Sequence, residues 1–310
     1  MSSKIAEAEQ HIKAAEDSLK TGLLKMRRSP DYDSAADEYA KAAAAFRAAR
    51  EFKRSQQMLV KTADITANHL KNLFHAAKHL ETAALLAKEV KNYEEAAEWL
   101  AKAGRMLREN GNPDSASLML EKGAKMLEEP LPEASARLYS DSADAADIED
   151  KVGQAAQCLG HACRMLIRAG KLDAAADVAR RRVGQAGRDS NPDTLSKAVL
   201  ALVVVELGRG DLVAARKAFN DSVHVSSFQT GDDCGPLQTL LEACEQMDGD
   251  RGRQALQNPV FRYMDNEFAK LARSIRLPEA RQKPSAAGGA AAEAAGAGAE
   301  DAEEFDGGLC

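Results

Sequence analysis

The sequence predicts an all-α protein, a right-handed superhelical solenoid of antiparallel helix pairs that ends in a C-terminal helical cap. Three observations support this fold class. Ala, Glu, Lys, Arg and Leu are abundant, while the 310 residues include only 9 Pro and 5% aromatic residues, a composition that favours helix. A pattern of small and large residues recurs every 19 to 21 residues. Gly, Pro, Asn and Asp lie between the copies, where they end one helix and cap the next.

The repeat is clearest in the segment "YDSAADEYAKA", which begins at Tyr32. Its first position is apolar or Pro, its fourth and eleventh are small, and its eighth is large and apolar. Offsets of this kind place all four positions on one helical face, so each copy predicts one helix with a packing seam. Recurrences of the frame begin at Ile12, Tyr32, Phe52, Leu73, Tyr93, Pro113, Pro132, Val152, Leu172, Pro192 and Leu212.

Helices of about 15 residues joined by short loops lie antiparallel, and one pair cannot bury its seams alone. The pairs are therefore expected to stack into a superhelix over residues 1–222. A two-helix unit of about 40 residues is longer than the tetratricopeptide repeat of about 34 residues, and it lacks the Trp and Gly-Tyr signature of that repeat. These observations indicate tetratricopeptide-like repeats with long helices.

The pattern changes after residue 222. An apolar helix is expected in "PLQTLLEACEQM", and the segment "PVFRYMDNEFAKLARSI" places apolar residues at helical spacing, so residues 223–278 are predicted to form a helical cap. Residues 279–310 are dominated by Ala, Gly and acidic residues, and this composition predicts disorder. The apolar residues at helical spacing are Phe261, Met264, Phe268, Leu271 and Ile275.

Charge and cysteine content exclude several classes of protein. The formal net charge is −6, most of it in residues 279–310, and the basic stripe typical of nucleic-acid binding is missing. No run approaches the roughly 20 apolar residues of a membrane-spanning helix, and no signal peptide is apparent. The five cysteines are scattered and odd in number, which favours reduced thiols in an intracellular protein.

The search for catalytic or metal-binding residues predicts no cofactor, no metal site and no enzyme. His75 and His79 have the spacing of two metal ligands, but they lack a general-base Glu and a third ligand nearby, and they are interpreted as ordinary helical residues. Cys158, His161 and Cys163 fall on different faces of one helix. No glycine-rich phosphate loop with a Walker lysine occurs.

Two surface features leave alternatives open. The run from Arg180 to Arg182 indicates either a solvated helix end or contact with an anionic partner. The turn that carries Leu23, Leu24 and Met26 has basic neighbours, so it can press on an anionic bilayer or pack on the second helix. Two classes remain from this reasoning: an adaptor that clasps elongated partners, and a structural subunit of a larger complex.

Three segments resemble the soluble NSF attachment protein family, and its gamma form in particular: "AEQHIKAAEDSLKTGLLK" with "PDYDSAADEYAKAAAAF", the cap segment "NPVFRYMDNEFAKL", and the terminal "FDGGLC". The resemblance covers essentially the whole chain. It implies a noncatalytic adaptor, monomeric when free, of which several copies surround a SNARE four-helix bundle. These adaptors recruit the hexameric ATPase NSF, which disassembles the bundle in vesicle fusion and intracellular protein transport.

The resemblance also implies residue roles at the C-terminal end. The family's acidic motif "LEAxEE" matches residues 241–246, so Glu242 and Glu245 are the candidates for NSF binding. Gln246 departs from the acidic pattern, and Asp248 is the expected compensation. Leu309 is the candidate for the terminal leucine that contacts the ATPase.

The resemblance implies SNARE-binding and membrane-contacting residues as well. Several positions that are lysine in the alpha form are apolar or small here, such as Leu118, so Lys102, Lys122 and Arg164 are the candidates for SNARE contact. Leu23, Leu24 and Met26 correspond to the membrane loop, which is less aromatic than in the alpha form, so weak contact with an anionic membrane is expected. The expected location is cytoplasmic and peripherally membrane-associated. The alternative function is a tetratricopeptide-like scaffold for a tethering or cytoskeletal coiled coil that acts without NSF.

Overall fold

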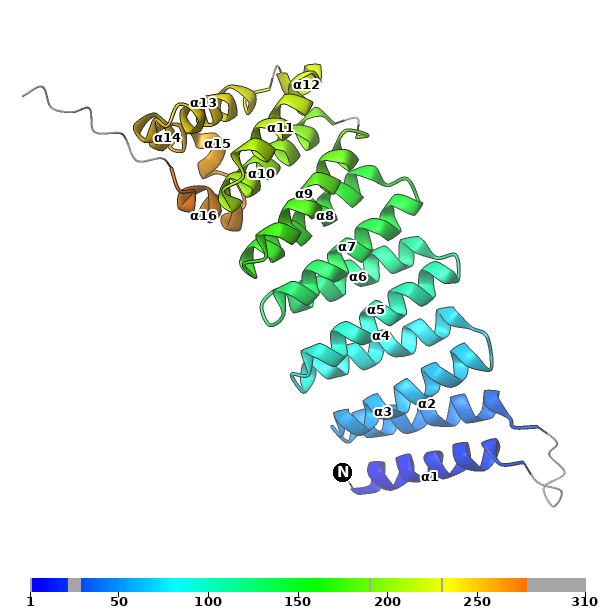
Figure 1. The fold of residues 1–310 in the computed structure, drawn as a ribbon. Coiled ribbons are helices and arrows are strands. Elements are labelled where there is room, and N and C mark those ends of the chain that lie inside the picture. Colours follow the sequence, from blue (N-terminus) through cyan, green and yellow to red (C-terminus); the bar gives the residue numbers. More distant parts are fainter. Residues whose placement is uncertain (1, 22–28, 190, 230, 278–310) are drawn as a thin grey trace, which may run out of the picture.

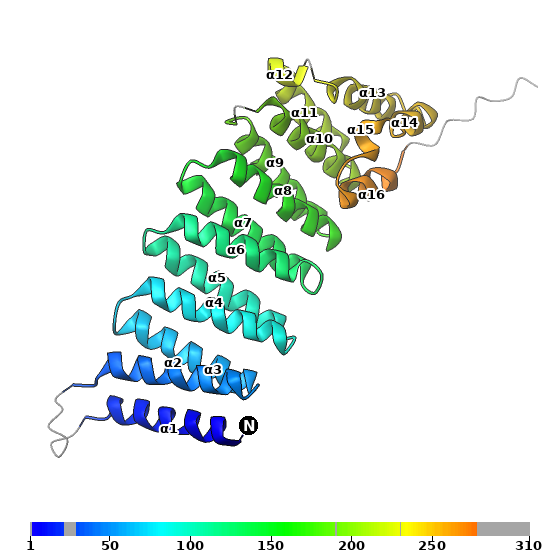
Figure 2. The ribbon, with the colours of Figure 1, turned by 180° about the vertical axis from the view of Figure 1, so that it is seen from behind.

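The computed structural model describes residues 2–21, 29–189, 191–229 and 231–277, and within these ranges it contains helices and no strand (Figure 1). The predicted all-α solenoid is confirmed, because α1 to α11 follow one another along an elongated array when seen from either side (Figure 2). The long helices are α1 (Ser2–Leu19), α2 (Tyr32–Ala48), α3 (Phe52–Asn68), α4 (Leu73–Glu89), α5 (Tyr93–Glu109), α6 (Pro113–Leu127), α7 (Pro132–Ile148), α8 (Val152–Arg168), α9 (Leu172–Ala186), α10 (Pro192–Arg209) and α11 (Leu212–Val223). The shorter C-terminal helices are α12 (Ser226–Gln229), α13 (Cys234–Glu245), α14 (Gly249–Ala255), α15 (Pro259–Arg262) and α16 (Asn266–Ser274).

The repeat frame coincides with the helix starts. Each helix from α2 to α11 begins at the first position of one frame copy. Capping explains several of these starts, because the side chains of Asp31, Asn72, Asn92 and Asp211 accept hydrogen bonds from backbone N–H groups in the first turn. The copy at Ile12 differs, since this residue lies inside α1. The helix-forming residues before Ile12 extend that helix back to Ser2.

Reciprocal contacts between glycine and leucine join α5 to α6. A Cβ atom added to Gly104 would lie 2.7 Å from a methyl carbon of Leu120, and one added to Gly123 would lie 2.6 Å from a methyl carbon of Leu100. Both leucines occupy the eighth position of the frame and are buried. The large residue of each helix therefore fills the space above the glycine of the other helix. In this helix pair the large eighth residue packs against the glycine at the eleventh position of α6 and against the glycine just after the eleventh position of α5, which illustrates how the small and large residues of the pattern fit together.

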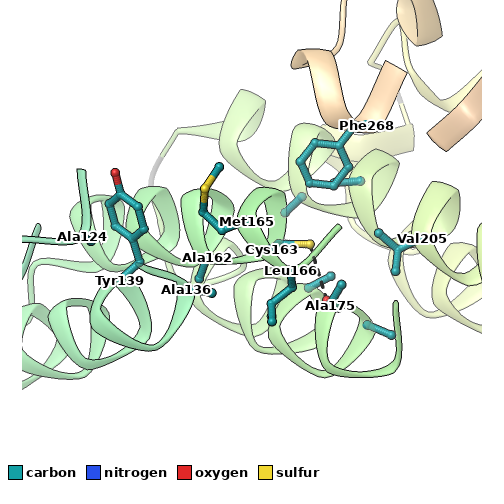
Figure 3. Packing of buried hydrophobic residues seen from close by; sticks show 14 of the residues in the cluster. Ala124, Ala136, Tyr139, Ala162, Cys163, Met165, Leu166, Ala175, Val205 and Phe268 are labelled. Atoms are coloured by element: carbon teal, nitrogen blue, oxygen red, sulfur yellow. Dashed lines mark hydrogen bonds between the residues drawn. The ribbon is translucent and has the colours of Figure 1, made fainter. Parts of the chain in front are cut away.

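One hydrophobic cluster extends from α3 to α16, and a second joins α1 through α4. Figure 3 shows part of the first cluster, where small side chains such as Ala162 and Ala175 let neighbouring helices approach closely. The Cys163 thiol donates a hydrogen bond to the Ala175 carbonyl oxygen at 3.4 Å. Phe268 of α16 belongs to the same cluster. The C-terminal helices are thus continuous with the core of the array.

Successive helices alternate between two layers, so the array has two long surfaces. We call the surface formed by α3, α5, α7 and α9 the odd surface, and the one formed by α4, α6 and α8 the even surface. Grooves on each surface are lined by helices of that layer. Ion pairs also join helices within a layer, such as Lys102 of α5 with Asp64 of α3 at 3.0 Å and Arg181 of α9 with Asp144 of α7 at 2.5 Å. These pairs lie between helices that are one repeat unit apart.

The C-terminal helices fold back onto the array. Helix α16 packs on α8 and α10, while α13 packs on α11. The apolar residues of 259–275 do not form one continuous helix, because α15 ends at Arg262 and α16 begins at Asn266. Tyr263 between them is 85% exposed, yet Phe261 and Phe268 are both buried. Both aromatic side chains therefore reach the core although a turn separates their helices.

Candidate interaction surfaces

The acidic residues predicted to bind NSF lie together at α13 and the start of α14, and each has an internal partner. Glu242 Oε2 lies 2.8 Å from Arg251 Nη2. Glu245 accepts hydrogen bonds at 2.6 Å from both Nε and Nη2 of Arg216. Asp248 caps α14 by accepting from the backbone N–H of Arg251 at 3.0 Å. The patch therefore alternates acidic and basic groups, and it is not a cluster of free carboxylates.

The hydrogen bonds at Glu242 favour its charged form. Hydrogen bonds from Gln238 and Arg251 hold the pKa of Glu242 below its usual value. The two-pronged contact of Arg216 with Glu245 is the geometry that an arginine and a carboxylate prefer. The carboxylates are consequently fixed in direction before any partner arrives. The sequence motif located the acids, but it gave no signal for the two arginines that hold them.

The structure does not bring the three predicted SNARE-binding cations together. Lys102 lies on the odd surface in its ion pair with Asp64. Lys122 is exposed on the even surface. Arg164 of α8 is largely buried, and its Nη2 atom lies 2.9 Å from Glu128 Oε1, which also accepts a hydrogen bond from Tyr139. Arg164 therefore links α8 to the end of α6.

A groove on the even surface, the α4–α6 groove, surrounds Lys122 and has a volume of about 500 Å³. Leu118 at its edge is 62% exposed. No carboxylate lies within 4.0 Å of the Lys122 ammonium group among the described residues, whereas the other two lysines of the groove are paired. The lining residues are Lys78, Glu81, Ser115, Leu118, Met119, Glu121, Lys122 and Lys125. The groove thus combines an exposed apolar side chain with an available positive charge.

The arginine run lies within α9 and not at its end, and Arg180 and Arg181 stay about half exposed while they form ion pairs. Arg180 pairs with Asp177 and with Glu206 of α10, and Arg181 pairs with α7. The Arg182 side chain packs over Gly160 of α8, where an added Cβ would lie 3.0 Å from the guanidinium carbon. The acids that α7 and α10 supply lie far from the run in the sequence. The run therefore stabilises the array.

Some predicted contacts lie outside the described residues. These are Leu23, Leu24 and Met26 of the membrane-contacting turn, Leu309, and the segment 279–310.

Two further searches covered only the described part of the chain. No group of three or more His, Cys, Asp or Glu side chains there could hold a metal ion. No helix there has the length and apolar composition needed to cross a bilayer.

An elongated array of helix pairs, with grooves along both long surfaces, is the architecture of a helical-repeat interaction protein. The family model described as "Soluble NSF attachment protein, SNAP" matches residues 6–266. The chain therefore belongs to the soluble NSF attachment protein family, which confirms the predicted resemblance. It is 27% identical to the gamma-soluble NSF attachment protein of Dictyostelium discoideum over 285 residues, which are 91% of this chain and 86% of that protein.

The matches among solved structures have lower sequence identity. BtubC (BKLC) of P. vanneervenii matches at 14% identity with a TM-score of 0.34, over 74% of this chain and 92% of that one. A circular tandem repeat protein matches at 16% identity with a TM-score of 0.29, over 87% of this chain and 78% of that one. These TM-scores do not indicate a shared fold.

Proposed function

We propose that this chain is a noncatalytic adaptor that binds a SNARE four-helix bundle and recruits the hexameric NSF ATPase for bundle disassembly in vesicle fusion and intracellular protein transport. The observation that carries this proposal is membership of the soluble NSF attachment protein family over residues 6–266. The gamma relative, similar over 91% of the chain, supports the same role. In this proposal the protein is cytoplasmic, peripherally associated with membranes and monomeric when free, and several copies act on one bundle.

We place the SNARE contact on the even surface. A SNARE bundle is a rod, and a long array of helices offers contacts along such a rod. The exposed Leu118 and the unpaired Lys122 of the α4–α6 groove supply an apolar contact and a positive charge for an acidic side chain of the bundle. Lys102 and Arg164 are already engaged with Asp64 and Glu128. Of the three predicted cations, Lys122 therefore has the best-supported role.

We place the NSF contact at the acidic patch of the C-terminal helices. Glu242, Glu245 and Asp248 are held in fixed directions by hydrogen bonds, so little conformational entropy is lost when a basic partner binds them. Leu309 is proposed as an additional contact with the ATPase. Leu23, Leu24 and Met26 are proposed to make weak contact with an anionic membrane.

The test is co-sedimentation of the purified protein with an assembled SNARE bundle at low and moderate salt. The assay is run with and without NSF, and the added NSF is in its ATP-bound state under conditions that prevent hydrolysis. A ternary complex that weakens with salt is expected. Lys122→Glu should reduce bundle binding, whereas the matched change Lys102→Glu on the odd surface should leave it unchanged. Equal losses for the two variants would contradict the assignment to the even surface.

A test of the NSF contact requires a variant that keeps the internal ion pair between Arg216 and Glu245. The double variant Arg216→Glu/Glu245→Arg swaps the two charges, so the pair is retained while the outward charge at position 245 is reversed. We expect this variant to bind the bundle and to lose NSF recruitment. Full recruitment would overturn the placement of the site. Binding to coiled coils in general, without any NSF recruitment by the unmodified protein, would instead favour a scaffold for a tethering or cytoskeletal partner.

A further inference from the structure

A second groove lies on the odd surface, between α3 and α5, and the proposed function makes no use of it. Its volume is about 430 Å³. Only these two helices and the residue that caps α5 line it, so it belongs to the layer opposite the α4–α6 groove. The lining residues are Lys53, Gln56, Gln57, Met58, Val60, Lys61, Asn92, Glu95 and Trp99. We call it the α3–α5 groove.

Gln56 gives this groove an unsatisfied donor. The residue is 4% exposed, and its Nε2 atom has no hydrogen-bond partner among the described residues. A buried donor without an acceptor is costly, and native proteins contain few of them. The Nε2 atom itself is buried, so Gln56 has to turn its amide toward the groove that it lines before an acceptor oxygen of a ligand can satisfy this donor. A main-chain carbonyl of a bound peptide is an acceptor of suitable size.

The groove also has an apolar floor with an aromatic side chain. Trp99 is partly buried and packs against both hydrophobic clusters at the place where they meet. Met58 is buried beside it, and Val60 is partly buried. A partly buried tryptophan supported by the core is rigid and offers a large contact area, which is typical of sites that anchor an apolar side chain.

Two lysines flank this floor. Lys53 and Lys61 are exposed, and neither ammonium group lies within 4.0 Å of a carboxylate in the described ranges. Their spacing of eight residues corresponds to about 12 Å along α3. Glu95 is the acidic residue of the lining, so the two lysines outnumber it. This arrangement favours a ligand with negative charge on both sides of an apolar group.

We propose that the α3–α5 groove binds a peptide segment of a partner protein in which an apolar side chain is flanked by acidic residues. The apolar side chain packs on Trp99, and a main-chain carbonyl accepts the hydrogen bond from Gln56 Nε2. The acidic side chains pair with Lys53 and Lys61. This site is distinct from the SNARE and NSF contacts proposed above.

The test begins with selection of 12-residue peptides from a displayed library against the full-length protein. The enriched peptides are then synthesised and titrated. Trp99 is the only tryptophan of the chain, so its fluorescence reports directly on the groove. We expect enriched sequences with an apolar residue between Asp or Glu residues, and a shift of the Trp99 emission on binding.

Variants of the groove separate the proposed contacts. Lys53→Glu/Lys61→Glu should weaken peptide binding by about tenfold or more, since hydrogen bonds to charged groups are lost. Gln56→Met, which keeps the size of the side chain and removes the donor, should weaken it several-fold. Lys122→Glu on the even surface is the matched control and should leave the affinity unchanged.

Three results would overturn this proposal. The first is a library selection that enriches no peptide dependent on Lys53 and Lys61. The second is an unchanged peptide affinity in Gln56→Met. The third is an equal fluorescence response to free glutamate, which would assign the groove to a small carboxylate. No SNARE or NSF is present in this assay, so its outcome is independent of the adaptor function.

Discussion

Replacing Gly104 by alanine tests the packing that explains the repeat. The added Cβ would lie 2.7, 2.8 and 2.9 Å from Cδ2, Cδ1 and Cγ of Leu120. Because Cγ is among the three atoms, rotation of the terminal methyl groups cannot relieve the clash and the whole side chain must move. Overpacking of this kind costs about 1–3 kcal/mol, and the higher helix propensity of alanine returns about 1 kcal/mol. We expect a net destabilisation of up to about 2 kcal/mol.

The sign of the effect should reverse when Leu120 is removed. Leu120→Ala alone is expected to destabilise the protein by about 2–5 kcal/mol, because it opens a cavity at a buried site. In that background the obstacle to an alanine at position 104 is gone, so Gly104→Ala should stabilise the protein by about 1 kcal/mol. Gly184→Ala is the matched control, because nothing lies within 4 Å of the Cβ added to this helical glycine.

Urea unfolding measures these differences, with circular dichroism for the whole array and Trp99 fluorescence for α5, the helix that carries Gly104. The double-mutant cycle isolates the coupling between positions 104 and 120. If Gly104→Ala changes the stability equally with and without Leu120, the explanation by reciprocal packing is refuted.

Three further predictions concern buried polar groups. Burial acts to raise the pKa of Glu267, but hydrogen bonds from Arg168 at 2.8 and 3.0 Å outweigh it and hold this pKa below its usual value. The stability that this ion pair contributes is therefore lost as the pH falls through the lowered pKa. The thermal midpoint should accordingly fall more steeply in acid for the unmodified protein than for Glu267→Gln, and equal slopes would contradict the role of the pair. Burial raises the pKa of Cys163 to about 12, so this thiol should resist a disulfide reagent at pH 8 until the protein unfolds, as mass spectrometry of the labelled chain can show. Gln56→Met should raise the free energy of unfolding by about 1 kcal/mol in urea titrations, because it removes an unsatisfied buried donor; a loss of stability would show that the amide has a partner.

Local sequence information was sufficient for the helices of the array. The frame positions that begin at Tyr32 recur where the helices start, since capping side chains and apolar periodicity act within a few residues of each other. The acidic motif likewise located Glu242 and Glu245 on one short helix. Such features depend on neighbours in sequence, and the residues themselves reveal them.

Contacts between distant residues were not predictable in the same way. From the sequence, the arginine run of α9 was interpreted as a solvated helix end or as a contact for an anionic partner. Only the structure shows its ion pairs with Asp144 of α7 and Glu206 of α10. The sequence also gave no indication that Glu242 and Glu245 of α13 form ion pairs with Arg251 and Arg216. The break between α15 and α16 was likewise not indicated by the helical spacing of the apolar residues in 259–275.

The sequence by itself determined the all-α class, the repeat length and the seam positions, because each follows from residue types at short and regular spacing, and three segments of it carried the family resemblance. Only the tertiary structure decided which lysines remain without a carboxylate partner, where Gln56 is left without an acceptor, and which surface each groove occupies. The physical reason is that these properties depend on side chains brought together from helices about one repeat unit apart, and the pattern within a single helix carries no information about them.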